Sequence, residues 1–324
     1  MKEKKKKKGK KKGKKKGKKG KAKTLKLPGC KYLKDKTPED MLLELVGNNI
    51  VKKLPPAQMS DFIGEFNYIH SMLDDVKLDM WDPSLALIRQ LITEYVIFPL
   101  GSELVKGRQR ENLSNLFFYG PPGGGKTLMV RAIVTATNSI LLDLSPVNTE
   151  GKFAGKKEEE RLLAMTFMTA KKYQPAVIYI DEAEKVWPAK KKKGKKGKKG
   201  GGGKKSKKSG DPTDPKRFKK PLGKWLKSGA KFLDPQQRIS IIACSSYPEE
   251  GSKKEFKKFF FKQIYFPAPD YTTLRLMWKN FIERYNGKLK SDFPISTLAH
   301  ISRGYTAGAI KKTCEKVLTG HRVK

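Results

Sequence analysis

The residues best suited to chemistry form a glycine-rich octet that ends in a lysine and a threonine. The octet, followed by Leu128 at the start of an apolar stretch, matches the pattern GxxxxGK[ST] and consists of Gly120, Pro121, Pro122, Gly123, Gly124, Gly125, Lys126 and Thr127. Glycines let backbone N–H groups turn toward a phosphate, and the N-terminus of a following helix adds partial positive charge. An apolar run precedes the octet, so a glycine-rich turn without a ligand is the less favoured interpretation.

The pattern assigns separate roles to the last two residues of the octet. We expect Lys126 to contact the β- and γ-phosphate oxygens of ATP, and Thr127 to offer its hydroxyl to Mg²⁺. A carboxylate should complete this site from a neighbouring strand. Asp181 and Glu182 directly follow the apolar run 177–180. Asp181 is expected to orient the Mg²⁺ shell, and Glu182 to polarise a water for attack on the γ-phosphorus.

Four apolar runs predict the strands that position these residues. They are residues 116–119, 140–144, 176–180 and 239–243, and helical stretches separate the first three. Such alternation predicts a parallel sheet with ligands at the carboxyl ends of its strands. We therefore expect an α/β fold over residues 79–268, with the sheet sandwiched by helices. A small all-α lid domain over residues 269–324 follows, with helices at 271–285, 295–302 and 306–318.

A helical leader is expected over residues 37–78. Thr37-Pro38 opens a first helix, and a second should follow Ser60, since Phe62, Phe66, Ile69 and Met72 recur at helical spacing. We interpret the second as a packing helix. A further helix should open at Asp82-Pro83 and end near residues 99–101. Its inward face is expected to carry Leu85, Leu87, Ile88, Leu91 and Ile92.

Two lysine-rich tracts dominate the formal net charge of +40. Residues 1–26 hold 17 lysines and one glutamate, and residues 190–208 hold 12 lysines and no acid. We expect a disordered tail over residues 1–36 and a disordered insertion over 190–217. These tracts suit nonspecific binding of a polyanion such as acidic tubulin tails, RNA, DNA or acidic lipid headgroups. Solvated tails without a partner are the alternative.

The cysteines and the hydropathy point to a soluble protein of a reducing compartment. Cys30, Cys244 and Cys314 lie far apart and match neither a disulfide framework nor a zinc site. No apolar run is long enough to span a membrane, and the N-terminus lacks the apolar segment of a signal peptide.

Several separated motifs over residues 79–319 resemble those of the AAA ATPases. They are the Gly-Pro-Pro-Gly form of the octet, Asp181-Glu182-Ala183, Lys152-Phe153-Ala154-Gly155 and the segment 304–310 with Gly308 and Ala309. The resemblance implies that residues 152–155 hold an aromatic pore-loop residue and that Gly308 and Ala309 face the nucleotide from the lid. Phe153 packing on a neighbouring helix is the alternative to the pore role.

The lysine-rich insertion and the helical leader look most like one branch of this family, the IQ-motif and AAA-domain proteins of the ciliary nexin-dynein regulatory complex. That likeness implies axonemal or other cytoskeletal partners and a cytoplasmic, ciliary or flagellar location. The sequence contains no IxxxQxxxRxxxxR repeat, which suggests a shorter paralogue or a fragment.

Two departures from the family pattern bear on turnover. Ser246 stands where the family usually has an asparagine that helps to position the attacking water, and Lys257 and Lys258 stand where arginine fingers reach the adjacent subunit. A serine hydroxyl has less reach and fewer donors than an amide, and an ammonium lacks the planar fork of a guanidinium. With Glu182, Ser246 and Lys258 as its catalytic candidates, the chain is expected to hydrolyse ATP slowly or not at all.

Three functions remain open at this point. The leading hypothesis is an ATP-Mg²⁺-binding AAA module that acts as a structural or regulatory subunit of an axonemal or cytoskeletal assembly. The second is an active remodelling ATPase that works as a ring. The third is a basic nucleic-acid-associated ATPase, which only the net charge favours.

Overall fold

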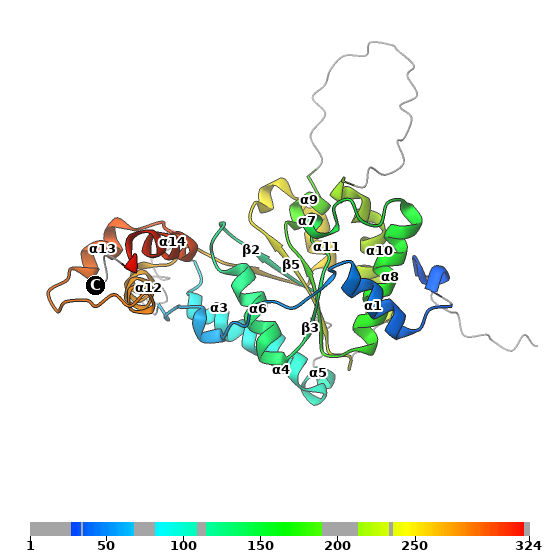
Figure 1. Ribbon diagram of the computed structural model, residues 1–324, viewed down its shortest axis with the longest axis horizontal. Helices are drawn as coiled ribbons and strands as arrows, with labels where there is room; N and C mark the ends of the chain where they lie inside the picture. The colour runs from blue at the N-terminus through cyan, green and yellow to red at the C-terminus, as the bar shows by residue number, and fades with distance from the viewer. Residues whose placement is uncertain are drawn as a thin grey trace, which may run out of the picture.

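A mixed sheet with helices on both faces forms the centre of the computed structural model (Figure 1). The structure describes residues 27–33, 35–67, 82–108, 115–189, 213–232 and 236–320. The expectations for residues 1–26 and for most of the lysine-rich insertion therefore lie outside the described residues. Within the described ranges, no helix is long and apolar enough to cross a membrane.

The sheet has six strands in the order β1-β3-β4-β5-β2-β6. The strands are β1 (Val51–Lys52), β2 (Asn115–Tyr119), β3 (Ile140–Asp143), β4 (Ala176–Ile180), β5 (Ile239–Ser245) and β6 (Lys262–Tyr265). All neighbours run parallel except β1, which pairs antiparallel with β3. Every residue of β4 and β5 is buried. The four predicted strands and the α/β class are thus confirmed.

Two strands escaped prediction because neither carries an apolar run. β1 has only two residues, Val51 and Lys52, which pair with Leu142 and Leu141. β6 includes a lysine and a glutamine, and Ile264 is its only fully buried residue. Hydrogen bonding to an existing sheet edge makes both segments strands, whatever their own composition.

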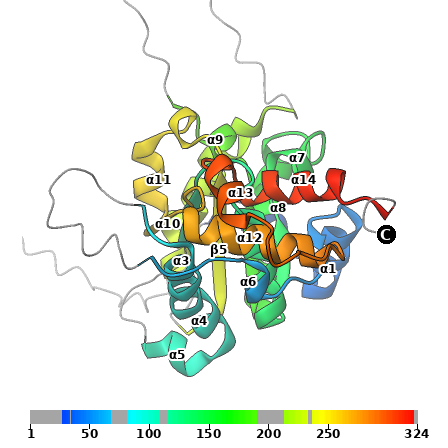
Figure 2. The same ribbon diagram turned by 90° about the vertical axis from the view of Figure 1, so that its left-hand side faces the viewer.

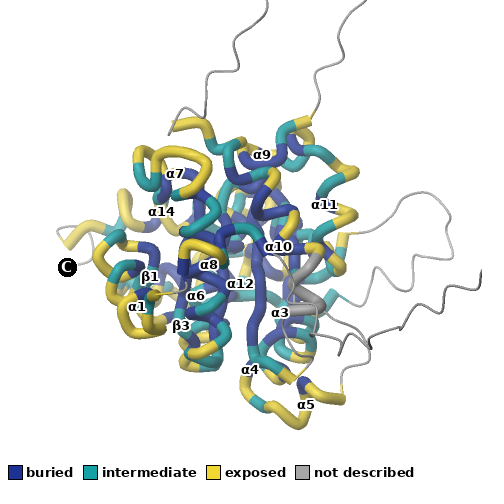
Figure 3. Tube along the Cα trace, turned by 90° about the vertical axis from the view of Figure 1, so that its right-hand side faces the viewer, coloured by how far each residue is buried: buried dark blue, intermediate teal, exposed yellow. Residues whose placement is uncertain are grey.

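One face of the sheet is covered by four helices and the other by three further helices. The first set is α1 (Pro38–Gly47), α8 (Lys156–Lys172), α10 (Lys219–Phe232) and α11 (Lys253–Phe259); the second is α3 (Leu85–Ile92), α4 (Phe98–Gly101) and α6 (Lys126–Thr137). Short helices are α5 (Glu103–Arg108), α7 (Pro146–Thr149) and α9 (Ala183–Val186). The buried segments gather at the centre of this arrangement (Figure 3).

The lid consists of α12 (Tyr271–Arg284), α13 (Ile295–Ile301) and α14 (Ala307–Val317). Its helices lie together beyond the end of the sheet, and they face the viewer in Figure 2. Trp278 anchors α12 to α13, since its indole N–H donates to the Ser302 hydroxyl at 2.8 Å. Met277 and Phe281 join the apolar cluster on the α6 face of the sheet.

The expected disordered tail is too long at its carboxyl end. Leu27 and Leu33 are buried, and Cys30–Leu33 forms a 3-10 helix against α8. The indole N–H of Trp225 donates to the Pro28 carbonyl at 3.2 Å. These contacts join residues nearly 200 positions apart in sequence, so the lysine-rich composition of the tail gives no sign of them.

The second leader helix is wrong for the described residues 62–67, which form neither helix nor strand after a 3-10 turn at Met59–Asp61. Phe62 is buried against the Phe266 ring, with the ring centroids 5.8 Å apart. Arg89 donates to the Phe62 carbonyl at 3.3 Å. The helix-like spacing therefore does not reflect one helical face at Phe62 and Phe66, and residues 69 and 72 lie outside the described part of the chain.

The helix expected from Asp82 begins at Leu85, with Ser84 as its N-cap. It continues through a π-helical turn at Thr93–Ile97 into α4. Leu87 was expected to face inward but is exposed, because its position on the helix points away from the buried stripe of Leu85, Ile88 and Ile92.

Candidate nucleotide-binding site

The glycine-rich octet forms the turn between β2 and α6, at the carboxyl end of the sheet. Gly120 has a φ of +152°, and a Cβ there would lie 2.1 Å from the Phe266 carbonyl oxygen. Gly123 has a φ of +81°, and its Cβ would meet the Thr306 hydroxyl at 2.7 Å. Only glycine fits at these two points, so the loop backbone stays bare and open to a phosphate.

Lys126 is buried at the start of α6, with its side chain folded over the loop. Its ammonium donates to the carbonyls of Gly120 at 2.9 Å and Pro121 at 2.8 Å. Burial lowers the pKa of Lys126, although the Asp181 carboxylate nearby acts in the opposite direction. A phosphate oxygen beside the loop would be a stronger acceptor than either carbonyl and would stabilise the charge.

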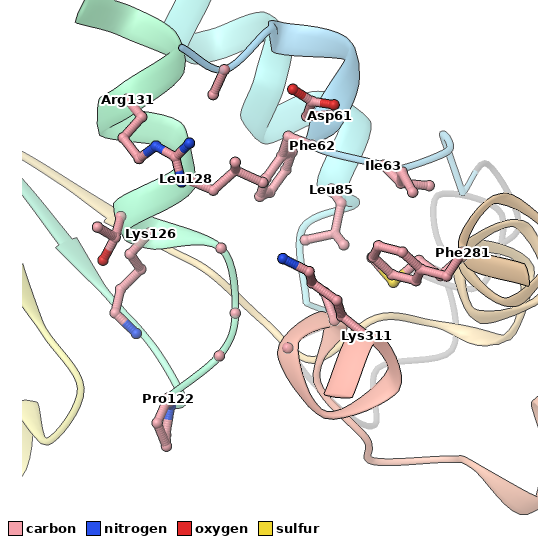
Figure 4. Close-up of a pocket in the computed structure, with 18 of the residues that line it drawn as sticks. Asp61, Phe62, Ile63, Leu85, Pro122, Lys126, Leu128, Arg131, Phe281 and Lys311 are labelled. Atoms are coloured by element: carbon pink, nitrogen blue, oxygen red, sulfur yellow. The ribbon is translucent and has the colours of Figure 1, made fainter. Parts of the chain in front are cut away.

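A cavity of about 550 Å³ opens above the loop (Figure 4). The octet with the first turn of α6, the leader segment 56–63 and the lid supply most of its lining, and Leu85, Asp181 and Ser246 complete it. Phe62, Leu85 and Phe281 form apolar walls suited to a flat, partly apolar ring. Loop and lid touch directly, because the Gly308 N–H donates to the Gly123 carbonyl at 3.0 Å.

Three cations in this cavity were missed from the sequence. Arg131 lies one turn along α6 and donates to the carbonyls of Pro55 and Pro56 at 3.0 and 3.4 Å. Arg284, at the end of α12, pairs with Asp61 at 2.5 Å. Lys311 extends from α14 into the cavity (Figure 4). Of the three, only Lys311 could have been found from the sequence, because it lies one helical turn after Gly308.

The leader segment links the P-loop helix to the lid across the cavity. At one end the Ala57 N–H donates to the Thr135 hydroxyl of α6 at 3.2 Å. At the other, the Asn67 amide donates to Asp270 at 2.8 Å, at the N-cap of α12. No local pattern in the leader predicts this bridge, because its partners lie far along the chain.

The residues expected to hold Mg²⁺ lie on the wall of this cavity. Thr127 and Asp181 both line it, from α6 and from the end of β4. Asp181 is fixed by two bonds: its N–H donates to the Ser145 hydroxyl, and its Oδ1 accepts from the Glu182 N–H, each at 2.9 Å. The described residues contain no group of three or more His, Cys, Asp or Glu side chains able to hold a metal.

This donor set fits Mg²⁺ bound together with a nucleotide. Mg²⁺ prefers oxygen ligands and is usually held by one or two protein groups plus phosphates and waters. One hydroxyl and one carboxylate beside a phosphate loop meet that requirement. Nucleotide and metal are therefore expected to bind together. The phosphates would supply most of the Mg²⁺ ligands that the protein does not provide.

The catalytic candidates are less well placed. Ser246 lines the cavity, but Glu182 does not. Glu182 has a φ of +47°, and its carboxylate pairs with the Lys185 ammonium at 2.7 Å. Lys258 is exposed on α11, away from this chain's own cavity. Of the remaining candidates, Pro122, Gly124, Gly125, Leu128 and Gly308 line the cavity, whereas Gly120, Pro121 and Ala309 flank it.

Phe153 packs on its own chain in this structure. Its side chain is half-buried against the core on the α8 face of the sheet, and its carbonyl accepts from Arg217 at 3.3 Å. The same guanidinium donates to the carbonyls of Thr149 and Lys152 at 2.6 and 2.8 Å. Within its own chain Phe153 thus packs on the core, and its role in a pore stays a prediction.

Replacing Lys185 with serine is expected to raise ATP turnover. The exposed Lys185–Glu182 pair restrains a candidate base, and exposed ion pairs are worth about 0.2–1 kcal/mol. Freeing Glu182 should therefore increase phosphate release roughly 1.5- to 5-fold at saturating ATP. The gain should vanish when Glu182→Gln is added to Lys185→Ser. Turnover that stays the same or falls in the single variant would show that the pair does not restrain Glu182.

The sheet order, the loop between β2 and α6 and the helical lid define a P-loop nucleotide-binding domain of the AAA class. In agreement, residues 116–205 match the family described as "ATPase family associated with various cellular activities (AAA)". The chain also superposes on the AAA domain of FIGL-1 in complex with ADP, with a TM-score of 0.59 and 17% identity. The superposition covers 88% of this chain and 82% of that one. The chain thus carries an AAA domain.

The chain is also similar in sequence to two curated proteins. Dynein regulatory complex protein 11 of Mus musculus is 33% identical over 303 residues, which are 91% of this chain and 33% of that protein. Spastin of Ixodes scapularis is 21% identical over 282 residues, covering 87% of this chain and 37% of that protein. The chain therefore spans about a third of the length of these relatives.

Proposed function

We propose that this protein binds ATP with Mg²⁺ and acts as a structural or regulatory AAA subunit of a cytoskeletal assembly, with slow or no turnover. One contrast within the site carries the proposal. Lys126, Thr127 and Asp181 lie together in the loop and on the cavity wall, whereas the candidate base Glu182 is ion-paired with Lys185 outside that lining. The site is thus better built to hold a nucleotide than to hydrolyse it.

The lysines that stand where arginine fingers are expected support slow turnover. Helix α11 carries lysines and no arginine at its exposed positions, including Lys257 and Lys258. Where they have been measured, arginine fingers contribute roughly a thousandfold or more to turnover. A lysine offers a point charge without bidentate geometry, so it stabilises the transferring phosphoryl group less well.

The setting rests on one relative. The name of Dynein regulatory complex protein 11 places that protein in a dynein regulatory complex, and the identity of 33% extends over most of this chain. We propose that this protein likewise has axonemal partners and is located in a cilium or flagellum. In this setting a nucleotide-dependent change in the lid would alter a protein contact, and chemical turnover would only reset it.

Nucleotide binding and phosphate release test the proposal together. Titration with a fluorescent ATP analogue should show saturable binding that Mg²⁺ strengthens. Steady-state phosphate release should remain well below about one per second. Turnover at or above that rate, lost in Glu182→Gln, would overturn the slow-turnover proposal and favour an active remodelling enzyme. Absence of saturable binding would contradict the nucleotide-binding role itself.

A further inference from the structure

Tyr179 carries a buried hydroxyl that the nucleotide site described above does not use. It is the fourth residue of β4, and only 6% of its surface is exposed. Its hydroxyl oxygen is buried and makes no hydrogen bond with any of the described residues. An unpaired hydroxyl in an apolar core costs free energy, and a phenylalanine would fill the same space without that cost. The Tyr179 hydroxyl therefore calls for a hydrogen-bond partner.

The surroundings of the hydroxyl identify that partner. Tyr179 belongs to β4, and Asp181 directly follows Ile180, the last residue of that strand. The polar groups close enough to act on the hydroxyl include the Cys244 thiol, the Asp181 carboxylate and the Thr127 hydroxyl. A thiol is a weak hydrogen-bonding group. The other two are the side chains that we assign to Mg²⁺.

The hydrogen-bonding capacity of the three groups is complementary. A threonine hydroxyl that gives its lone pair to a metal keeps a proton to donate, and a tyrosine oxygen can accept it. The tyrosine hydroxyl can in turn donate a hydrogen bond to the Asp181 carboxylate. Oδ1 of Asp181 accepts one backbone N–H, from Glu182, and a carboxylate has about four acceptor positions. A chain from Thr127 through Tyr179 to Asp181 would thus satisfy all three groups.

We propose that Tyr179 is a positioning residue for Mg²⁺: its hydroxyl bridges Thr127 and Asp181 from behind and holds both oxygens toward the cavity. This inference rests on the proposed binding of ATP with Mg²⁺ at the same site. Groups of this kind, which contact the ligands of a metal and not the metal itself, orient those ligands. Tyr179 lies too deep to touch the nucleotide, so it acts only through the two side chains that it orients.

The test compares ATP binding with and without Mg²⁺ in the full chain and in Tyr179→Phe. Dissociation constants are measured in EDTA and in excess Mg²⁺, and their ratio gives the gain due to the metal. Tyr179→Phe should bind ATP in EDTA within twofold of the native protein but lose roughly tenfold of the Mg²⁺ gain. The temperature at which Tyr179→Phe unfolds without nucleotide should not fall below that of the native protein, because the hydroxyl that it lacks makes no hydrogen bond in the structure.

A matched control comes from Tyr119, which ends β2 and packs on the opposite face of the sheet. Tyr119→Phe should keep the full Mg²⁺ gain. If Tyr179→Phe also keeps the full gain, or loses affinity equally with and without Mg²⁺, Tyr179 is not a positioning residue for the metal. If the native protein itself shows no saturable ATP binding, the proposed function fails first.

Discussion

Replacing Lys126 with alanine is expected to weaken ATP binding by roughly 100-fold or more. The ammonium donates to two loop carbonyls, and the phosphates of a bound nucleotide would offer it stronger, charged acceptors in their place. Hydrogen bonds that involve a charged group are worth about 1.5–3 kcal/mol each, so the loss of two corresponds to at least a hundredfold. Equilibrium titration with a fluorescent ATP analogue in Mg²⁺ would measure the change.

A lysine far from the cavity provides the control for this substitution. Lys224 is exposed on α10 and does not line the cavity, so Lys224→Ala removes the same charge without touching the site. It should leave the dissociation constant within twofold of the native value. Should Lys126→Ala bind ATP within threefold of the native protein, the octet would not be the phosphate-binding element.

Replacing Trp225 with alanine is expected to lower the free energy of unfolding by about 3–5 kcal/mol. Trp225 is fully buried on α10 and stacks on Phe167 of α8, with ring centroids 4.6 Å apart and planes 6° from parallel. Its indole N–H also holds the Pro28 carbonyl. The substitution therefore leaves a large cavity between two helices and releases the ordered N-terminal segment. Urea denaturation followed by circular dichroism would measure the loss.

Trp225→Phe separates the two contributions. Phenylalanine keeps a ring against Phe167 but removes the indole N–H that bonds to Pro28. The loss should then be smaller, on the order of 1–3 kcal/mol, from a smaller cavity and one hydrogen bond. Limited proteolysis should nevertheless cut near residues 27–33 faster in both variants. A loss below about 1 kcal/mol in Trp225→Ala would contradict the role of this stack in the core.

The elements that local sequence predicts well are those whose signal is contained in a few consecutive residues. The four central strands are short apolar runs because both faces of each strand are covered, and Ile180 leads directly into the Asp181-Glu182 pair. The phosphate loop is equally local, since glycine is required at Gly120 and Gly123 by their own φ values and close neighbours. Charge and composition likewise place the lysine tracts without any structure.

Other parts of the site could not be predicted, because they depend on which distant segments meet. The helical spacing from Phe62 misled because Phe62 enters the nucleotide cavity and packs on Phe266. In the sequence, Arg131 and Arg284 look like ordinary surface residues of their helices. In the structure, both contact the leader beside the loop.

Local sequence patterns thus predict the nucleotide-binding loop, the carboxylates at the end of β4, and the alternation of strands and helices that brings them together. Tertiary structure alone decided that Glu182 pairs with Lys185, that the leader bridges α6 and the lid, and that the Tyr179 hydroxyl lies unpaired behind Thr127 and Asp181. The difference lies in how far along the chain each kind of interaction acts. Backbone conformation and hydrophobic periodicity act over a few residues, whereas the pairing or isolation of a polar group depends on every segment that packs around it.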